Sequence, residues 1–259
     1  MTTSLIVSTY NNVPFLRLSL NSLLEQSVFP DEVLIADDGS THETKDFIEQ
    51  FKKICPIRLI HVWQEDKGFR LSKIRNEAIK VSCCEYLIFI DGDIVMHDRF
   101  IEDHKRLARR GYYVTGSRVF ISEKATNEMA ESSMPKKIFF WDDSIVFGRI
   151  NALYLPQLTN VTVNIHKGRR LYGRGANMAM WKKDIELING FNQDIVGYGD
   201  EDSDAFNRLN NNHIKRRYAK FQAIAYHLHH EPKVNNQDRE ILRINDDSIL
   251  VCKNGLRQL

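Results

Sequence analysis

The chain has 259 residues, 42% of them hydrophobic and 27% charged, which is the composition of a soluble globular protein large enough to bury a core. Its 36 basic and 34 acidic residues leave a net charge of +2, and no compact basic-aromatic motif occurs, so we expect no nucleic-acid partner. There is no run of about 18 apolar residues and no signal-peptide pattern. The four cysteines lack metal-ligand spacing, and we expect a reduced, cytoplasmic chain.

Basic residues are clustered in three places, at 105–110, 167–174 and 215–220. Such clusters are either solvated helix faces or surfaces that meet phosphates or an anionic membrane. Peripheral membrane contact therefore stays open.

The first 120 residues alternate between short apolar runs and helical patterns. Runs typical of strands occupy 5–8, 32–40, 57–62, 86–90 and 112–117. Apolar residues at helical spacing occupy 15–24, 47–54, 71–81 and 99–110. This alternation requires crossover connections, so it predicts an α/β fold with a mainly parallel central sheet flanked by helices. Ligands of such sheets lie beyond the carboxyl ends of the strands.

Residues 121–172 lose this rhythm, because a polar stretch is followed by a strongly aromatic one. No Gly/Ser linker separates them from the rest, so we expect one domain over 1–259. Beyond them, 184–190 and 200–212 predict two further helices, the second with acidic residues at its start.

The strand at 86–90 ends abruptly at Asp91-Gly92-Asp93. Asp-Gly is a favoured hairpin turn, which is one interpretation. The other is a strand end that faces a ligand crevice, where the carboxylates bind a hard divalent cation. The helical patterns on both sides favour the second interpretation.

A second acidic cluster contains Asp200, Glu201, Asp202 and Asp204. Helix capping explains one or two of these residues. Four acids within five residues repel one another, so at least one pKa should be raised, which suits a general base.

The segment "YHLHHEP" forms a histidine cluster. His227 and His229 would share one face of an extended segment, and His230 would point the other way. Paired imidazoles suit Mn²⁺ or Zn²⁺, and a histidine-rich surface strand is the alternative.

Two further segments are candidates for nucleotide contact. In "ADDGS", Asp37 or Asp38 would receive a ribose hydroxyl or a base N–H, unless the segment is a plain β-turn. In "RLSKIRNEAI", Arg70, Lys73 and Arg75 gather near a helix start that suits a diphosphate, unless they are ordinary surface charges.

Together these motifs resemble those of inverting glycosyltransferases of the family 2 type, which have the GT-A fold. Over about 3–120 the resemblance is carried by "VSTYNN", "ADDGS", "RNEAI" and "IFIDGD". Over about 173–232, "GRGANMAMWKKDIELINGFNQDIVGYGDEDSDAFNRL" and "YHLHHEP" are similar to the C-terminal region of β-1,4-galactosyltransferases and chondroitin-polymerase-like transferases. The resemblance divides the chain into a nucleotide-binding half, 1–120, and an acceptor and catalytic half, 121–259.

The resemblance implies roles on the nucleotide side of the site. Ser8, Tyr10 and Asp38 match positions that hold the uridine. Arg75 matches a helix arginine near the nucleotide and phosphates, and Asp91 matches the aspartate nearer the ribose.

It also implies the metal and the catalytic groups. Asp93, His227 and His229 match ligands of a divalent metal, with Mn²⁺ favoured over Mg²⁺. Asp202 matches the carboxylate proposed as base, and Glu201 matches its neighbour, which contacts the acceptor or donor sugar.

The sequence departs from the galactosyltransferase pattern at three positions close to these acids. Tyr198 stands where Trp is usual, Asp200 where Gly is usual and Ser203 where a further Asp is usual.

The implied function is metal-dependent transfer of a hexose from a UDP-sugar to a saccharide or lipid-linked saccharide acceptor, with inversion to a β-glycoside. Galactose and N-acetylgalactosamine are favoured over the glucose forms, and surface polysaccharide or glycoconjugate synthesis is the expected setting. A nucleotidyltransferase is one alternative, although "STYNNVPFLR" lacks its Gly-rich basic loop. A non-catalytic nucleotide-sugar-binding module is the other. We expect Phe139, Phe140 and Trp141 to be core residues, with stacking on a sugar ring as the alternative.

Overall fold

The computed structural model describes residues 1–165, 175–231 and 248–259, and its central element is a seven-stranded sheet in the order β10-β6-β9-β4-β1-β2-β3. The strands of this sheet are β1 (Thr3–Thr9), β2 (Glu32–Asp37), β3 (Arg58–Trp63), β4 (Tyr86–Asp91), β6 (Tyr112–Gly116), β9 (Asn177–Trp181) and β10 (Lys215–Ala219). Strands β1 to β4 pair in parallel, as the alternation of the sequence predicts.

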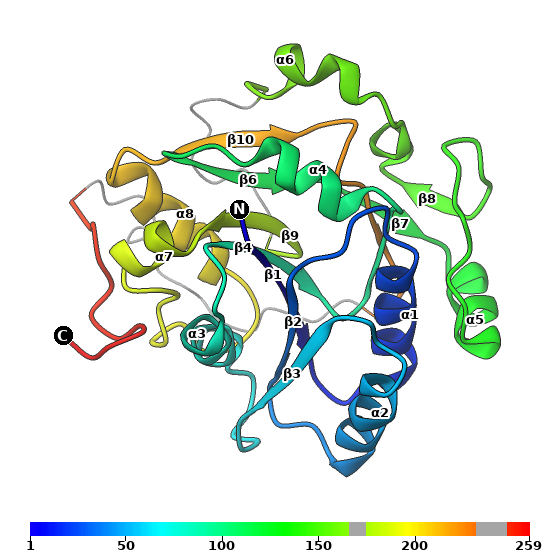
Figure 1. Cartoon of the computed structure of the whole chain (residues 1–259), viewed down its shortest axis with the longest axis horizontal. Coiled ribbons are helices and arrows are strands. Elements are labelled where there is room, and N and C mark those ends of the chain that lie inside the picture. Colours follow the sequence, from blue (N-terminus) through cyan, green and yellow to red (C-terminus); the bar gives the residue numbers. More distant parts are fainter. Residues whose placement is uncertain (166–174, 232–247) are drawn as a thin grey trace.

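Helices cover both faces of the sheet (Figure 1). They are α1 (Val13–Leu24), α2 (His42–Lys52), α3 (Leu71–Val81), α4 (Phe100–Leu107), α7 (Lys182–Leu187) and α8 (Glu201–Asn211). Alternate residues of the buried strands supply the two cores, because successive side chains point to opposite faces. Leu5 and Val7 pack with the apolar stripes of α1, α2 and α4, whereas Ile6 packs with those of α3, α7 and α8. The predicted α/β architecture is confirmed.

The connections change direction along the sheet at β1, so that β2 and β3 lie on one side of this strand and β4 lies on the other. From β1 the chain steps through α1 to β2 and through α2 to β3 on one side, and then returns through α3 to β4 on the other. Ser8 near the end of β1 pairs with Asp91 at the end of β4. Such a switch point opens a crevice beyond the carboxyl ends of the two strands, and ligands of open α/β sheets bind there.

Strand β9 joins the second half of the chain to this sheet. It lies antiparallel between β4 and β6, with Tyr86 opposite Trp181 and Ile90 opposite Asn177. The sequence pattern did not predict this strand, because a five-residue apolar run without alternation resembles a buried helix segment equally well.

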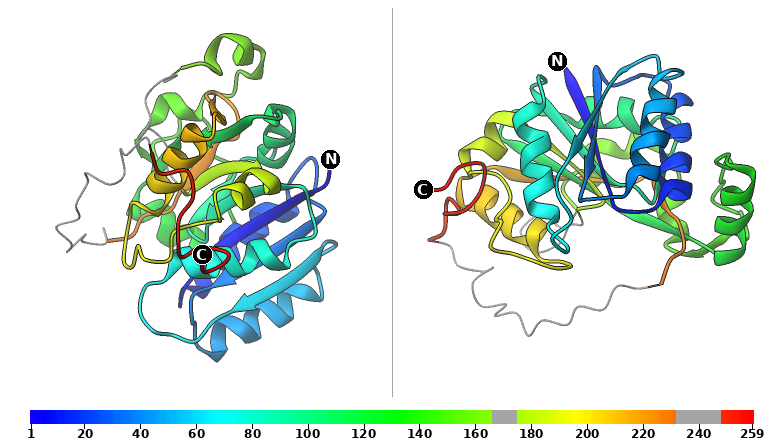
Figure 2. Two further views of the ribbon diagram at one scale, coloured as in Figure 1. Left: turned by 90° about the vertical axis from the view of Figure 1, so that its left-hand side faces the viewer. Right: turned by 90° about the horizontal axis from the view of Figure 1, so that it is seen from below.

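A second, four-stranded sheet has the order β5-β11-β7-β8 and stands beside α1 and α5 (Glu123–Ser132) at one edge of the molecule (Figure 2). Its strands are β5 (Ile94–Met96), β7 (Arg118–Ile121), β8 (Ile145–Phe147) and β11 (Ala225–His227). Strand β5 pairs with β11 and not with β4. The hairpin interpretation of Asp91-Gly92 is therefore wrong, and β4 ends at the crevice instead.

The aromatic segment before β8 is exposed. Phe139, Phe140 and Trp141 have exposed fractions of 52%, 40% and 67%, so the expectation that they are core residues is wrong. The core at this place is filled by Ile138 and Ile145, and the three rings pack against one another. Three short helices follow β8: η1 (Arg149–Ala152), η2 (Pro156–Leu158) and α6 (Thr159–Thr162). None of the described helices is both long enough and apolar enough to span a bilayer.

Candidate functional site

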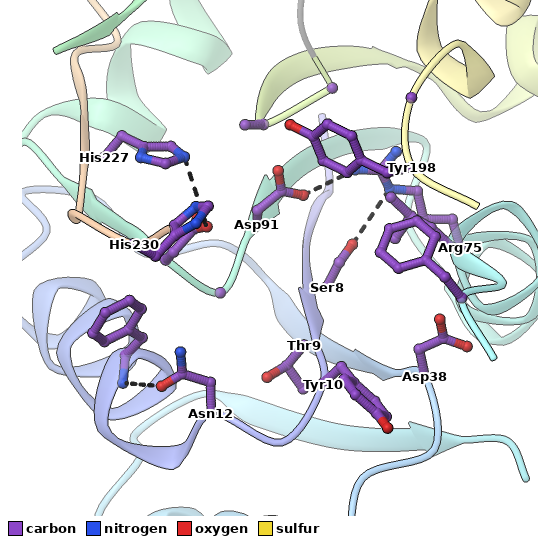
Figure 3. A pocket seen from close by; sticks show the side chains of 18 of the residues that line it. Ser8, Thr9, Tyr10, Asn12, Asp38, Arg75, Asp91, Tyr198, His227 and His230 are labelled. Carbon is purple, nitrogen blue, oxygen red and sulfur yellow. Dashed lines mark hydrogen bonds and ion pairs between the residues drawn. The ribbon is translucent and has the colours of Figure 1, made fainter. Parts of the chain in front are cut away.

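A cavity of about 750 Å³ opens at the switch point between β1 and β4 (Figure 3). It brings together side chains from segments that are far apart in the sequence. Of the ten site residues predicted from the sequence, nine line it: Ser8, Tyr10, Asp38, Arg75, Asp91, Asp93, Glu201, Asp202 and His227. The tenth, His229, is not among its lining residues, and His230 is.

One wall of the cavity carries a group of three potential metal ligands, Asp93, His227 and His230. The Nε2 atoms of His227 and His230 lie 3.6 Å and 3.1 Å from Oδ2 of Asp93. Oδ1 of Asp93 is buried and has no hydrogen-bond partner among the described residues. A carboxylate and two imidazoles, with one carboxylate oxygen unsatisfied, form a donor set that suits a divalent cation.

The charge states of this group also suit a metal. Burial lowers the pKa of His227 to about 4, despite the opposing charge of Asp93, so its imidazole is neutral at pH 7. Burial alone would raise the pKa of Asp93, but the hydrogen bond from His230 and the two neighbouring imidazoles outweigh it and lower the pKa. Metal ligands must be deprotonated, and these two groups are.

The structure brings His230, and not His229, to Asp93. Strand β11 ends at His227, so the alternation of an extended strand does not continue beyond it. The backbone N–H of Leu228 donates to the carbonyl of Asp93, and that of His229 donates to Oγ1 of Thr126 in α5. The expectation that favoured His229 over His230 assumed a longer strand, and the described geometry does not follow it.

Behind the metal-ligand group, a buried arginine connects both acidic motifs. Arg75 is 0% exposed. Its Nη2 donates to Oδ1 of Asp91 and its Nη1 to Oε1 of Glu201, each at 3.0 Å, and its Nε donates to Oγ of Ser8 at 3.3 Å. Burial raises the pKa of Asp91, with the charge of Arg75 opposing it and that of Asp93 adding to it. The arginine predicted to lie near phosphates is thus held by internal partners at the cavity wall.

The acids at the start of α8 have different surroundings: some face the cavity, and one forms an ion pair within the helix. Asp202 faces the cavity, with Oδ2 accepting from the N–H of Gly175 and Oδ1 from the N–H of Ser203, both at 2.6 Å. Asp204 forms an ion pair with Arg208 one helical turn away. The cluster therefore supplies the helix with an internal ion pair through Asp204 and leaves Glu201 and Asp202 to the cavity.

Glu201 is the acid whose pKa is raised, as the crowding of the cluster predicts. Burial and the charge of Asp202 raise it to about 7, although Arg75 opposes the shift. Its Oε2 atom is buried without a hydrogen-bond partner in the described part of the chain.

The two aspartates at the end of β2, Asp37 and Asp38, point to different places. Asp37 turns inward, where it accepts from the N–H of Ser40 and lies 2.8 Å from Nε2 of His61. Asp38 lines the cavity and accepts from the N–H of Arg70. Burial raises the pKa of Asp38, with the hydrogen bond from Arg70 opposing it.

Sequence reasoning missed two groups of the cavity wall. Arg118 lines the cavity and directly follows the strand predicted at 112–117, which is a signal of the same kind as at the other strand ends. Phe69 and Tyr198 meet edge to face at 6.2 Å, and both line the cavity. Phe69 carries no motif, and Tyr198 stood out only as a departure from the galactosyltransferase pattern.

Comparison with known proteins connects this geometry to a family. Residues 4–179, more than half of the chain, match the model of glycosyl transferase family 2. Residues 166–231 match a model described as the N-terminal domain of galactosyltransferase.

Curated relatives are similar over most of this chain. It is 25% identical to a chondroitin synthase of Escherichia coli, with 91% of this chain and 36% of the relative covered. It is 25% identical to a hyaluronan synthase of Pasteurella multocida (92% and 25% covered). It is 23% identical to a validoxylamine A glucosyltransferase of Streptomyces hygroscopicus subsp. limoneus (80% and 47% covered). The chain thus spans less than half the length of each of these relatives.

Solved structures share the fold. TarS 1–349 of S. aureus in complex with UDP-GlcNAc superposes with a TM-score of 0.65 at 19% identity, with 90% of this chain and 60% of that chain covered. The mannosyltransferase PcManGT of Pyrobaculum calidifontis, in complex with GDP-Man and Mn²⁺, superposes with a TM-score of 0.60 at 18% identity (90% and 58% covered). The chain therefore belongs to glycosyl transferase family 2 and has the GT-A fold.

Proposed function

We propose that the protein transfers a hexose from a UDP-sugar to a saccharide or lipid-linked saccharide acceptor, in a metal-dependent reaction that inverts the anomeric centre to a β-glycoside. Galactose and N-acetylgalactosamine are the favoured hexoses, followed by glucose and N-acetylglucosamine. The observation that carries the proposal is the meeting of three groups in one cavity: the strand-end side chains, the Asp93 group and the acids of α8.

The relatives support a sugar-nucleotide donor. Their names describe a glucosyltransferase and two glycosaminoglycan synthases, and the superposed structures contain UDP-GlcNAc or GDP-Man. Within this cavity we assign the nucleotide to the side formed by Ser8, Tyr10 and Asp38, because these residues lie at the ends of the parallel strands β1 and β2.

A divalent metal fits the residues present. Asp93, His227 and His230 would hold it, since Asp93 has an unsatisfied oxygen and His227 is neutral. An ion bound there supplies Lewis-acid stabilisation of the negative charge on the departing diphosphate. Mn²⁺ is favoured because two imidazoles contribute, and Mg²⁺ prefers oxygen ligands.

Asp202 is the proposed general base. The N–H groups of Gly175 and Ser203 fix its carboxylate at the cavity wall, and such fixing keeps a base in line with an acceptor hydroxyl. When the hydroxyl gives its proton to Asp202, its oxygen attacks the anomeric carbon, and the bond to the diphosphate breaks on the opposite side. This single displacement turns an α-linked donor into a β-glycoside.

Glu201 has a different proposed role. Its carboxylate is bonded to Arg75 and is more buried than that of Asp202. We assign it to a contact with the acceptor or donor sugar, which its raised pKa supports, because a carboxyl that is partly protonated near pH 7 can donate a hydrogen bond to a sugar oxygen.

The test is release of UDP from a panel of UDP-hexoses with Mn²⁺ and a set of defined saccharide acceptors. Acceptor-dependent UDP release that stops in excess EDTA supports the proposal. Pyrophosphate release from nucleoside triphosphates would instead favour a nucleotidyltransferase. UDP-sugar binding without any release would favour a non-catalytic module. Turnover that persists in EDTA would contradict the metal role.

A further inference from the structure

Three side chains on neighbouring strands of the small sheet form a continuous row. His227 of β11 is the register partner of Phe120 in β7, and Phe120 is the partner of Phe147 in β8. Directly opposed residues point to the same face of a sheet. The rings are in contact, with centroids 5.0 Å apart for His227 and Phe120 and 5.8 Å apart for Phe120 and Phe147.

The row leads from the cavity to solvent. His227 is 8% exposed and belongs to the metal-ligand group, whereas Phe147 is 70% exposed at the edge strand of the sheet. Arg118 stands two residues before Phe120, so it shares the same face of β7. Its guanidinium lies 5.2 Å from the centre of the Phe120 ring, and it also lines the cavity. The row is therefore continuous with the site assigned to the reaction.

Two residues that follow Phe147 contact the backbone of β7 and hold the exposed end of the row in place. Gly148, directly after Phe147, has a φ of +77°, and a Cβ at this position would lie 2.8 Å from the carbonyl oxygen of Arg118. Only glycine adopts this conformation readily at such close approach. Asn151 donates to the same carbonyl at 3.3 Å. The chain thus holds the Phe147 ring at the edge of the small sheet, although this ring does not belong to the core of the region.

We propose that Phe147 and Phe120, which lead to the metal-ligand group at His227, form the subsite for the acceptor saccharide, a proposal that rests on the proposed transferase function. The C–H faces of a pyranose ring are apolar and stack on aromatic rings, and its hydroxyl edge needs donors and acceptors. Phe147 offers an exposed ring, and Arg118, whose guanidinium lies over the Phe120 ring, offers donors further inward. The row crosses three strands, so it is long enough for more than one sugar ring. An oligosaccharide therefore gains contacts that a monosaccharide does not.

A saccharide fits this row better than a lipid surface does. The row ends at the cavity, where an acceptor hydroxyl has to meet the anomeric carbon of the donor, and this position suits the saccharide part of an acceptor. The other exposed rings of the region, Phe139 and Trp141, follow Ile138, whose carbonyl accepts from the hydroxyl of Tyr226. Tyr226 precedes His227 in β11, so that segment is attached to the opposite face of the small sheet.

The test compares Phe147→Ala, Phe147→Tyr and the control Trp141→Ala on an array of immobilised oligosaccharides of defined structure, with the protein loaded with UDP and Mn²⁺. Both exposed rings leave the core intact when removed, since Phe147 is 70% and Trp141 67% exposed. We expect the alanine variant at Phe147 to lose about threefold to tenfold in glycan affinity while its affinity for UDP, measured by calorimetry, is unchanged. The tyrosine variant and the Trp141 control should bind glycans like the wild type.

The remaining outcomes are decisive in the other direction. Equal glycan binding by wild type and Phe147→Ala, or no glycan bound by the UDP-loaded wild type, overturns the proposal. Loss of binding to vesicles of equal parts phosphatidylglycerol and phosphatidylcholine in Phe147→Ala, with glycan binding unchanged, would assign the row to lipid instead. Absence of UDP release from any UDP-hexose would contradict the transferase function separately, because the glycan array does not measure turnover.

Discussion

Replacing Arg75 by methionine should destabilise the protein strongly and in a pH-dependent way. The side chain is 0% exposed and holds Asp91 and Glu201 through ion pairs of 3.0 Å each. Removing one partner of a buried ion pair leaves an uncompensated charge and costs about 3–5 kcal/mol. Methionine fills much of the arginine volume, so the loss reports mainly on charge.

The pH dependence follows from the two carboxyl groups left behind. Arg75 lowers the pKa of both in the folded state, and Glu201 still titrates at about 7. Without Arg75 both folded-state pKa values rise further, whereas the unfolded values stay the same. The folded variant then holds protons that the folded wild type has already released, so the stability lost relative to wild type should grow as the pH rises from about 5 to 8.

The assay is urea unfolding followed by circular dichroism at pH 5.5 and pH 8. The matched control is Lys80→Met on the same helix, which removes the same charge from an exposed pair with Glu77. That pair should contribute no more than about 1 kcal/mol. A loss below about 1 kcal/mol for Arg75→Met, or a loss that is no greater at pH 8 than at pH 5.5, would refute the proposed charge network.

Three further predictions concern the cavity. Asp202→Asn should lower kcat for UDP release at least about 100-fold without changing UDP affinity, and near-normal turnover would remove Asp202 as the base. His230→Ala should weaken Mn²⁺ binding, measured calorimetrically in the presence of UDP, by about tenfold or more, whereas His229→Ala should not; the reverse order would restore the ligand set expected from the sequence. The wild-type free energy of unfolding should fall as the pH rises from about 4.5 to about 7, because Glu201 ionises first in the unfolded chain. Glu201→Gln should reduce that slope, to which Asp103, with a pKa raised to about 6, also contributes, and an unchanged slope would assign it to other groups.

The sequence predicts those parts of the fold in which the spacing of apolar residues alone distinguishes a strand from a helix. Alternation of apolar runs and helical spacing over the first 120 residues predicts parallel strands, and parallel strands place their polar ends at one edge. The sequence pattern therefore assigns Ser8, Asp38 and Asp91 to one site, and they line one cavity.

The parts that it does not predict depend on where an element stops. His230 reaches Asp93 because β11 ends at His227, and nothing in "YHLHHEP" marks that end. Likewise, Phe139 and Trp141 are as apolar as core residues. They are exposed because Ile138 fills the adjacent place in the core, which only the folded structure shows. Tertiary packing sets both outcomes, and a local pattern carries no information about it.

Strand β9 also has a consequence for the biogenesis of the protein. It fills the position beside β4 with a segment about ninety residues further along the chain, and Gly175, which orients Asp202, lies two residues before it. A chain that ends near residue 120 would therefore present β4 as an open edge with unpaired backbone groups, ready to pair with other chains. During synthesis, the carboxylate of Asp202 can be positioned only after this late strand has been inserted. A released N-terminal half should be an aggregation-prone fragment and not a working nucleotide-binding domain, and non-local closure of this kind is slow.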